Sequence, residues 1–323
     1  EIACGVGAIG TDYAGRAKID PEKCVSCGMC MVSCPFGAIA DKSQIYQLIK
    51  AMNEGNEVIA ILAPAFVGQF GPKATPNKIK AALLDIGFFD VWEVAVGADA
   101  GALEEAEHYA HGVATGEVPF LLTSCCPSWA MLGKKYFPEV IDQISNALTP
   151  MVATARAARQ TNKDAKIVFV GPCVAKKLEA SRRSVRSEVD FVITFEELAA
   201  MFEAKDIDFN TYDKEVELND AFGAGRGYAV ASGVAGAIEA CVKEYYPGTD
   251  IKIDHVEGLA ECRKMLLQAK AGKKNGYLIE GMGCPGGCVA GAGTNIPVNK
   301  ANAQVKKFVK EAEAFVPPET AKY

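Results

Sequence analysis

Apolar runs alternate with helical patterns along most of the chain. Runs rich in Val and Ile are typical of buried strands, and they lie at Glu57–Phe66, Asp90–Val96, Phe120–Thr123, Lys166–Val170, Asp190–Thr194 and Tyr277–Glu280. Helical patterns fall between these runs, at Lys78–Leu84, Ala102–His111, Met151–Gln160 and Phe195–Ala204. Strands that alternate with helices favour an α/β fold with mainly parallel sheets.

The first 45 or so residues differ in composition from the rest of the chain. They are rich in Cys, broken by Gly and Pro, and contain an internal repeat. Ala3–Ile9 (ACGVGAI) aligns with Ser33–Ile39 (SCPFGAI) at a period of 30 residues. Small repeats of this kind build modules with two-fold pseudo-symmetry, so we expect a separate segment ahead of the α/β part.

Three of the predicted strands run directly into cysteines. The strands that begin at residues 120, 166 and 277 are followed by Cys125 and Cys126, by Cys173, and by Cys284 and Cys288. Ligands in open α/β sheets bind beyond the carboxyl ends of the strands. The three loops are therefore predicted to converge on one buried site.

The composition of the chain also favours a metal-binding site. The chain has 323 residues, of which twelve are Cys and half are hydrophobic, and its formal net charge is −6. Disulfide frameworks serve small secreted domains without a core, so clustered cysteines here indicate metal ligands. Cys241 and Cys262 lie outside the clusters, and we expect them to fill apolar space. The mild acidity argues against a nucleic-acid partner, and no apolar run approaches the roughly 18 residues of a membrane span.

Two sets of cysteines are candidates for metal centres. The run Cys24-x-x-Cys27-x-x-Cys30-x-x-x-Cys34-Pro35 matches the bacterial ferredoxin pattern for a [4Fe–4S] cluster. Zinc is the alternative, although zinc sites usually pair two separated C-x-x-C knuckles. The second set suits either a cubane or a closed zinc site by ligand type alone, and it consists of Cys126, Cys173, Cys284 and Cys288.

The surroundings of the second set resemble a known family. Thr123–Trp129 (TSCCPSW), Gly171–Glu179 (GPCVAKKLE) and Glu280–Cys288 (EGMGCPGGC) look like the three signature loops of the [FeFe], or iron-only, hydrogenases. The resemblance covers roughly residues 20 to 297. It implies an H-cluster, in which a [4Fe–4S] cubane is joined to a diiron unit that carries CO, cyanide and a bridging dithiolate amine.

The resemblance also implies roles for individual residues. The cubane ligands would be Cys126, Cys173, Cys284 and Cys288, with Cys288 bridging to the diiron unit. Cys125 would be a thiol that exchanges protons with the bridging amine, since a thiol can give and take protons near neutral pH. Lys176 would donate a hydrogen bond to cyanide, and Met282 would pack against the diiron unit. Ser124 and Pro172 are expected to contact the cofactor from the same loops.

A proton route is implied by positions on either side of Cys125. Glu105 and Ser145 stand twenty residues before and after it, where typical members of the family have a Glu and a Ser. His108 stands where a second Glu is usual. The alternative is that this stretch, with Glu104 and Glu107, forms a solvated helix face.

Two departures mark a divergent branch of the family. Gly171 and Ala175 replace the usual Met and Ser, so we expect a roomier and less polar pocket beside the diiron unit. Gly223–Gly227 (GAGRG) resembles a phosphate loop only superficially. Its small residues are expected to let a helix pack closely.

The internal repeat makes Cys4 the counterpart of Cys34. In two-cluster ferredoxins, the fourth cysteine of each run ligates the other run's cluster. Cys4 would then complete a cluster with Cys24, Cys27 and Cys30, while Cys34 would belong to a second cluster. The alternative is that Cys34 closes its own run and Cys4 is a free thiol.

The resulting hypothesis is a reversible hydrogenase of two parts. Residues 1–45 would form an N-terminally truncated ferredoxin-like segment that relays electrons, and residues 46–323 a two-lobed α/β domain with the H-cluster between the lobes. The implied partners are a ferredoxin-like electron carrier, H2 and protons, and maturation enzymes. An iron–sulfur assembly protein and an H2 sensor of the same superfamily are the alternatives. We expect a cytoplasmic location; the chain begins at Glu1 without Met, which leaves an upstream export signal open.

Overall fold

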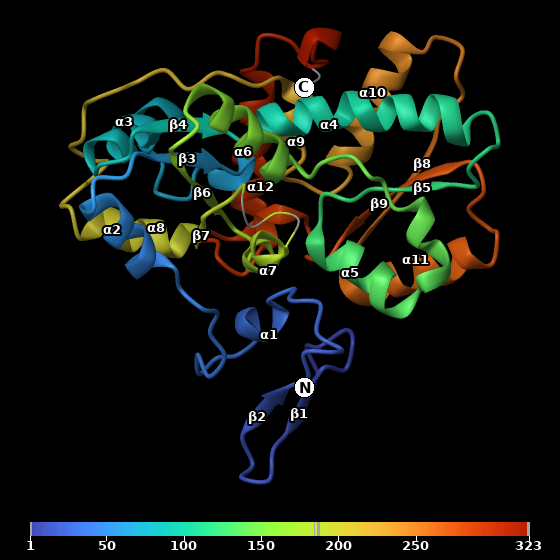
Figure 1. The fold of residues 1–323 in the computed structure, drawn as a ribbon, viewed down its shortest axis with the longest axis horizontal. Coiled ribbons are helices and arrows are strands. Elements are labelled where there is room, and N and C mark those ends of the chain that lie inside the picture. The colour runs from blue at the N-terminus through green and yellow to red at the C-terminus, as the bar shows by residue number, and fades with distance from the viewer. Residues whose placement is uncertain (1, 184, 186–187, 322–323) are drawn as a thin grey trace.

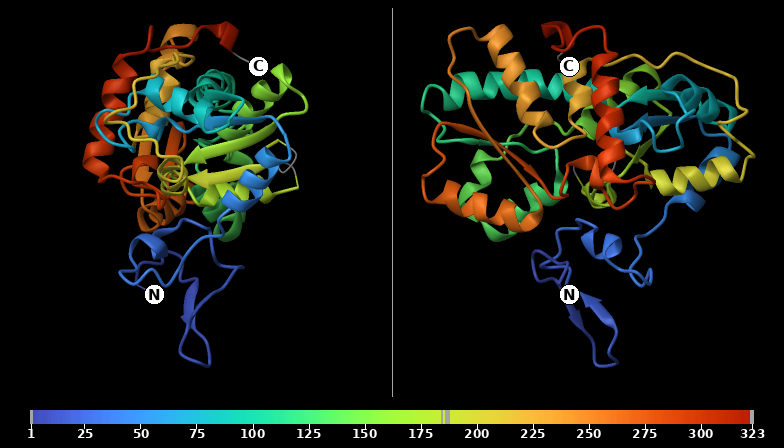
Figure 2. Two further views of the ribbon diagram at one scale, coloured as in Figure 1. Left: turned by 90° about the vertical axis from the view of Figure 1, so that its left-hand side faces the viewer. Right: turned by 180° about the vertical axis from the view of Figure 1, so that it is seen from behind.

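The computed structural model describes residues 2–183, 185 and 188–321 of the chain. It consists of two α/β lobes side by side, with a slender N-terminal segment projecting beneath them (Figure 1). The right-hand view of Figure 2 shows the two lobes from behind, and in both of its views the N-terminal segment lies beneath them. This is the α/β fold with parallel sheets that the sequence predicts, preceded by a small N-terminal segment.

The first lobe is built on a four-stranded parallel sheet in the order β4-β3-β6-β7. All five residues of β3 are buried, which is why its sequence is continuously apolar rather than alternating. Helices α6 and α8 pack on strands of the sheet. The elements of this lobe are β3 Val58–Leu62, β4 Asp90–Glu93, β6 Lys166–Gly171, β7 Phe191–Thr194, α2 Ile45–Asn53, α3 Pro76–Asp85, α6 Pro150–Thr161, α7 Ala175–Ser181, α8 Phe195–Glu203 and α12 Val298–Lys310.

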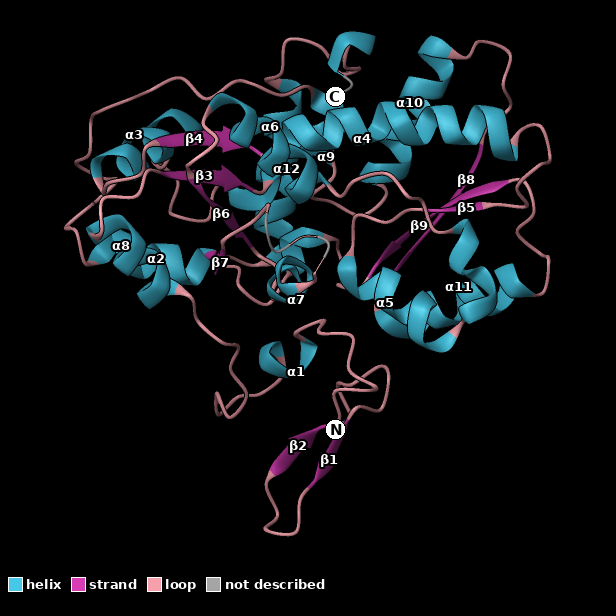
Figure 3. Cartoon of the chain, in the orientation of Figure 1, coloured by secondary structure: helices cyan, strands magenta, loops and turns pink. Residues whose placement is uncertain are grey.

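The second lobe has a three-stranded parallel sheet in the order β5-β9-β8. Figure 3 shows this sheet between two pairs of helices, α4 with α10 on one side and α5 with α11 on the other. Cys241 and Cys262 are buried in these helices, as expected. The elements are α4 Ala95–His108, β5 Leu121–Leu122, α5 Pro127–Tyr136, α9 Gly223–Gly227, α10 Gly233–Tyr245, β8 Lys252–Glu257, α11 Leu259–Lys270 and β9 Tyr277–Met282.

The start of α4 differs from the sequence prediction. The stretch Asp90–Val96 favours a strand, but β4 ends at Glu93 and the helix begins at Ala95. The Thr154 hydroxyl of α6 explains the change, because it accepts a hydrogen bond from Gly97 N–H (3.1 Å) and donates one to Val94 O (3.2 Å). A tertiary contact thus overrides the local preference for strand. The predicted strand Glu57–Phe66 is likewise shorter, since a 3-10 turn begins at Pro64.

The glycine-rich stretch Gly223–Gly227 forms the short helix α9 and packs closely, as expected. A Cβ at Gly225 would overlap the carbonyl oxygen of Ala95. The carboxylate of Asp99, on α4, accepts hydrogen bonds from Phe222 N–H (2.8 Å) and Gly225 N–H (2.7 Å). These contacts hold α9 firmly against α4.

The N-terminal segment contains a hairpin, β1 Ile9–Thr11 with β2 Ala17–Ile19, and the short helix α1 Met29–Val32. It is attached to the second lobe by Tyr136, whose hydroxyl donates to Lys23 O (2.9 Å), and by Lys135, which donates to Cys24 O (2.9 Å). These hydrogen bonds attach the N-terminal segment to the end of α5.

Candidate metal centre

Five cysteines from three loops line one cavity between the lobes. The loops follow β5, β6 and β9, at the carboxyl ends of these strands, where parallel sheets place their ligand sites. The rest of the wall is largely apolar and includes Phe169, Met282 and Pro172. The cavity has a volume of about 80 Å³, several times the space that one water molecule needs. Its cysteines are Cys125, Cys126, Cys173, Cys284 and Cys288.

The donors suit an iron–sulfur group. Burial raises the pKa of Cys173 to about 11 and raises the pKa values of Cys284 and Cys288 as well. Thiolates therefore need a positively charged partner here, and metal binding supplies it as the thiols lose their protons. The Gly283 N–H donates a hydrogen bond to Cys126 Sγ (3.3 Å). Among the described residues no three Cys, His, Asp or Glu side chains are grouped to hold a single metal ion; the thiols instead surround the cavity, which suits a cluster of several atoms.

Lys176 enters the cavity from α7. Its ammonium donates to Glu179 Oε2 (2.6 Å) and to Cys125 O (3.3 Å), and both charged groups are buried. Burial alone would lower the pKa of Lys176, but the Glu179 carboxylate more than compensates and the pKa is raised. The lysine thus stays cationic, with one of its three donors left for an anionic group in the cavity.

Glu105 and Ser145 lie next to each other and close to Cys125. Burial raises the pKa of Glu105 to about 7, while a hydrogen bond from the Ser145 hydroxyl and one from the Ser124 backbone act in the opposite direction. Glu105 Oε1 has no hydrogen-bond partner within the described part of the chain. The alternative of a solvated helix face therefore does not hold for Glu105, which is 3% exposed.

His108 lies elsewhere on the same helix. It is partly exposed, and its Nε2 lies 4.0 Å from Glu104 Oε1. A surface pair of this kind contributes little to stability. The structure therefore joins Glu105 and Ser145 to the buried site and leaves His108 on the solvated side of α4.

The expectation of a roomier pocket is wrong at Gly171. A Cβ at this position would lie 2.5 Å from Phe169 Cε1 and 2.9 Å from Ala63 Cβ, so the Phe169 ring occupies the space beside the glycine. Ser124 also differs from expectation. Its hydroxyl donates to Ala147 O (3.3 Å), and its side chain does not line the cavity, whereas Pro172 does.

The N-terminal segment has its own cysteine-lined pocket. It is bordered by Cys4, Cys24, Cys27 and Cys30, but not by Cys34. The neighbouring thiols Cys30, Cys4 and Cys24 each add to the effect of burial in raising the pKa of Cys27 to about 11. This grouping is the one that the crossed assignment predicts.

The internal repeat is visible in the backbone as two matching turns. Ala8 N–H donates to Cys4 Sγ (3.1 Å), and Ala38 N–H donates to Cys34 Sγ (3.4 Å). The glycines Gly7 and Gly37 have φ values of 62° and 59°. The two cysteines thus have equivalent local settings, but only Cys4 faces the other three.

Sequence reasoning assigned no role to Glu280 or Tyr228. The buried carboxylate of Glu280 accepts hydrogen bonds from Ser232 N–H and Ala235 N–H (both 2.8 Å), and so caps the N-terminus of α10. Tyr228 lines the cavity. Neither role has a local sequence signal, because the partners of both residues lie far away in the chain.

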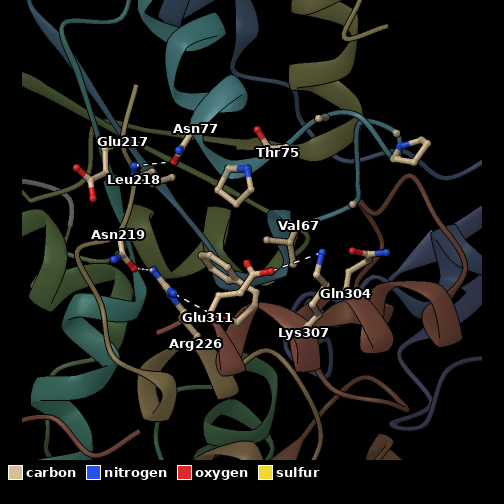
Figure 4. A pocket seen from close by; sticks show the side chains of 16 residues that line it. Val67, Thr75, Asn77, Glu217, Leu218, Asn219, Arg226, Gln304, Lys307 and Glu311 are labelled. Carbon is tan, nitrogen blue, oxygen red and sulfur yellow. Dashed lines mark hydrogen bonds and ion pairs between the residues drawn. The ribbon is translucent and has the colours of Figure 1, made fainter. Parts of the chain in front are cut away.

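A second, larger pocket lies away from the cysteines (Figure 4). Three of its charged side chains are held in ion pairs: Arg226 pairs with Glu93 (2.7 Å), and Lys307 pairs with Glu311 (3.5 Å). Arg226 also donates to Asn219 Oδ1 (2.9 Å) and lies over the Phe308 ring. These contacts give Arg226 and Lys307 a structural role. The thiol-lined cavity therefore remains the candidate site.

Comparison with protein families gives two matches. The model described as "Iron only hydrogenase large subunit, C-terminal domain" matches residues 56–292, and the model described as "4Fe-4S binding domain" matches residues 17–40. No helix in the described ranges has the length and apolar character needed to cross a membrane.

Individual relatives include hydrogenases and other proteins. The chain is 28% identical to the NADP-reducing hydrogenase subunit HndD of Solidesulfovibrio fructosivorans over 84% of its own length, but it spans only about half (55%) of that protein. It is 29% identical to the periplasmic [Fe] hydrogenase large subunit of Nitratidesulfovibrio vulgaris, with 85% of each chain covered. A cytosolic Fe-S cluster assembly factor of Kluyveromyces lactis is 36% identical over 30% of this chain and 21% of its own length.

Solved structures share the fold. An [FeFe]-hydrogenase of Chlamydomonas reinhardtii superposes with a TM-score of 0.68 at 20% identity, covering 85% of this chain and 91% of that chain. At this identity the likeness concerns the arrangement of the two lobes and not their chemistry.

Proposed function

Because this chain belongs to the iron-only hydrogenase family, we propose that it interconverts protons and electrons with H2, reversibly, at an H-cluster. One observation carries the proposal: four thiols, the additional thiol Cys125 and the buried cation Lys176 converge on one cavity. An electron carrier alone would have no use for the last two groups.

The four thiols Cys126, Cys173, Cys284 and Cys288 would hold a [4Fe–4S] cubane, and Cys288 would also bridge to a diiron unit with CO, cyanide and a dithiolate amine. When bound, that unit supplies the making and breaking of the H–H bond. The protein positions it and excludes water, and the apolar side chains of Met282, Pro172 and Phe169 form the dry wall.

Lys176 would donate its remaining N–H to a cyanide ligand. The Glu179 carboxylate orients the ammonium, and Thr149 orients the carboxylate through a 2.6 Å hydrogen bond to Oε1. Groups that hold a cofactor contact in place are as necessary as the contact itself. The ion pair would also keep the lysine charged after the site is closed to water.

Protons would reach the cavity through Glu105 and Ser145. With a pKa of about 7, Glu105 can hold a proton or release it near neutral pH. Cys125 would hold the proton at Sγ on the cavity side. Electrons would come from a ferredoxin-like carrier, through a cluster held by Cys4, Cys24, Cys27 and Cys30, with Cys34 serving a different cluster.

On this proposal, residues 1–45 form the electron-relay segment and residues 46–323 the H-cluster domain. Dedicated maturation enzymes would install the diiron unit. A cytoplasmic location is part of this proposal. Ser124, which does not line the cavity, would act through its backbone hydrogen bond to Glu105.

A second candidate function is iron–sulfur assembly. It is favoured by the relatives named as cluster assembly factors. H2 sensing is a variant of the hydrogenase proposal, with slow turnover. Cys125, Lys176 and Glu105 favour a hydrogenase, because an assembly factor has no need for a proton-exchanging thiol and a buried cation in the same cavity.

Infrared spectroscopy of the protein, produced together with hydrogenase maturation enzymes, tests the proposal. We expect bands of metal-bound CO and cyanide, and H2 evolution with a reduced viologen dye. A protein that carries its cubanes but shows neither the bands nor H2 would support the assembly function instead.

A further inference from the structure

The hydroxyl of Tyr228 is a buried polar group without a partner. The residue is 6% exposed, and its OH makes no hydrogen bond with any described residue. Most buried polar atoms in proteins have a partner, and one that lacks it within the chain indicates a bound group or a water. Tyr228 lines the thiol cavity together with Cys125, Cys288 and Met282.

The position of Tyr228 is fixed from two sides. Its own N–H donates to Gly225 O (3.2 Å) in α9, and Asp99 holds that helix against α4. On the other side, Ala229 O accepts a hydrogen bond from Val289 N–H (3.1 Å), directly after Cys288. These hydrogen bonds fix the main chain at Tyr228 beside the loop that carries this thiol.

The surroundings make the hydroxyl a donor. Burial, with Glu105 and Cys125 nearby, raises the pKa of Tyr228 well above its usual value, so the phenol stays protonated. The other strong donor in the cavity is Lys176, and two of its three N–H groups already point at protein oxygens. Sulfide and cyanide are acceptors without protons of their own.

We propose that the Tyr228 hydroxyl donates a hydrogen bond to the inorganic group held by the four thiols, at a sulfide of the cubane or at a ligand of the diiron unit. This inference rests on the proposed function in so far as the thiols hold an iron–sulfur group. Tyr228 is thereby a cofactor-positioning residue on the wall formed by the α9–α10 connection. No cysteine motif points to Tyr228, because this residue lies outside the three cysteine loops.

Tyr228→Phe keeps the ring and removes only the hydroxyl. In protein that carries the cubane alone, a redox titration followed by electron paramagnetic resonance measures the midpoint potential of that cluster. Hydrogen bonds to cluster sulfur influence this potential. If the hydroxyl donates to a sulfide, the potential falls in Tyr228→Phe; if it donates to a diiron ligand, the potential is unchanged and the CO and cyanide bands of the completed protein shift instead.

Tyr245→Phe is the matched control. The Tyr245 hydroxyl donates to Pro317 O (2.7 Å), and this residue does not line the cavity, so neither readout should change. Thermal melting gives a second measurement. In the protein without inorganic groups in the cavity, Tyr228→Phe should melt at the same temperature or higher, because an unpaired buried hydroxyl is lost; in the loaded protein it should melt lower.

Two results would overturn the inference: unchanged potential and unchanged infrared bands in Tyr228→Phe, or equal changes in Tyr245→Phe. Failure of the proposed function looks different. In that case the wild-type protein itself shows no CO or cyanide bands, while the cubane potential still reports on the hydroxyl.

Discussion

Gly28 and Val174 are in contact across the junction between the N-terminal segment and the lobes. A Cβ at position 28 would lie 2.7 Å from Val174 Cγ2 and 2.8 Å from Ala292 Cβ. Gly28 follows Cys27 and Val174 follows Cys173, so the contact lies between the two sets of cysteines. The neighbouring Cys27 also contributes to the raised pKa of Cys284, after burial and the nearer thiols.

Gly28→Ala should weaken this junction. The residue has φ = 77°, which costs a side-chain-bearing residue about 1 kcal/mol, and the new methyl group would push Val174 away. We expect slower electron transfer between the two clusters, measured by stopped-flow oxidation of the reduced protein. Gly37→Ala is the control, because its φ is 59° but a Cβ there meets nothing within 4 Å. Equal rates in Gly28→Ala and Gly37→Ala would contradict the prediction.

Adjacent cysteines should behave differently when each is replaced. Cys125→Ala should retain the cubane but nearly abolish H2 turnover, because it removes the thiol that we propose holds the proton. Cys126→Ala should lose the cubane, since it removes one of the four proposed ligands. Iron content and an H2 assay distinguish the two. Substantial turnover in Cys125→Ala would show that protons reach the cofactor by another route.

Glu105→Gln should lower turnover by at least about tenfold, the scale usual for a positioned acid–base group. Changing His108 should have a smaller effect, because that side chain is partly exposed and lies near Glu104 instead. The pH profile of H2 evolution provides the measurement. Wild-type turnover in Glu105→Gln would place the proton route elsewhere.

The same variant should also change the pH dependence of stability. Burial raises the pKa of Glu105 to about 7 in the folded protein, against about 4.3 in an unfolded chain. The folded state therefore favours the protonated carboxyl, and this contribution is present below about pH 4 and lost as the pH rises to 7. Glu105→Gln should gain stability relative to wild type between pH 5 and 8. Urea unfolding at several pH values tests this, and a constant difference would contradict it.

Cys4→Ser and Cys34→Ser separate the two possible ligand sets of the N-terminal cluster. Cys4 borders the pocket with Cys24, Cys27 and Cys30, and Cys34 does not. Cys4→Ser should therefore damage the cluster, and Cys34→Ser should spare it. Iron content and electron paramagnetic resonance report the outcome. Damage only in Cys34→Ser would restore the alternative that Cys34 closes its own run.

Gly171→Ala should destabilise the protein by about 1–3 kcal/mol, as overpacking usually does. The added methyl group would clash with the Phe169 ring, which is itself buried and would have to shift. Phe169→Leu combined with Gly171→Ala should recover part of the loss. Gly236→Ala serves as the control, because a Cβ there meets nothing within 4 Å. Urea unfolding compares the four proteins.

The sequence alone predicted an iron–sulfur protein of the iron-only hydrogenase family, and the family matches confirm this assignment. The spacing of Cys24, Cys27 and Cys30 places three thiolates in one tight loop, and this depends only on local geometry. The repeat similarly predicts that Cys4 is equivalent to Cys34, and the two turns do match. Strand periodicity and the cysteines at strand ends predicted the parallel α/β fold and the convergence of the three loops.

Only the tertiary structure decided how the site is surrounded. Whether Glu105 is buried, whether Phe169 fills the space beside Gly171, and whether the Tyr228 hydroxyl has a partner all depend on residues far away in the sequence. Ser124 shows the same limit, because its neighbour Cys125 lines the cavity while its own hydroxyl turns to Ala147. Ligand spacing is a property of a short stretch of chain, whereas burial and the pKa shifts that follow from it arise where two lobes and an N-terminal segment meet.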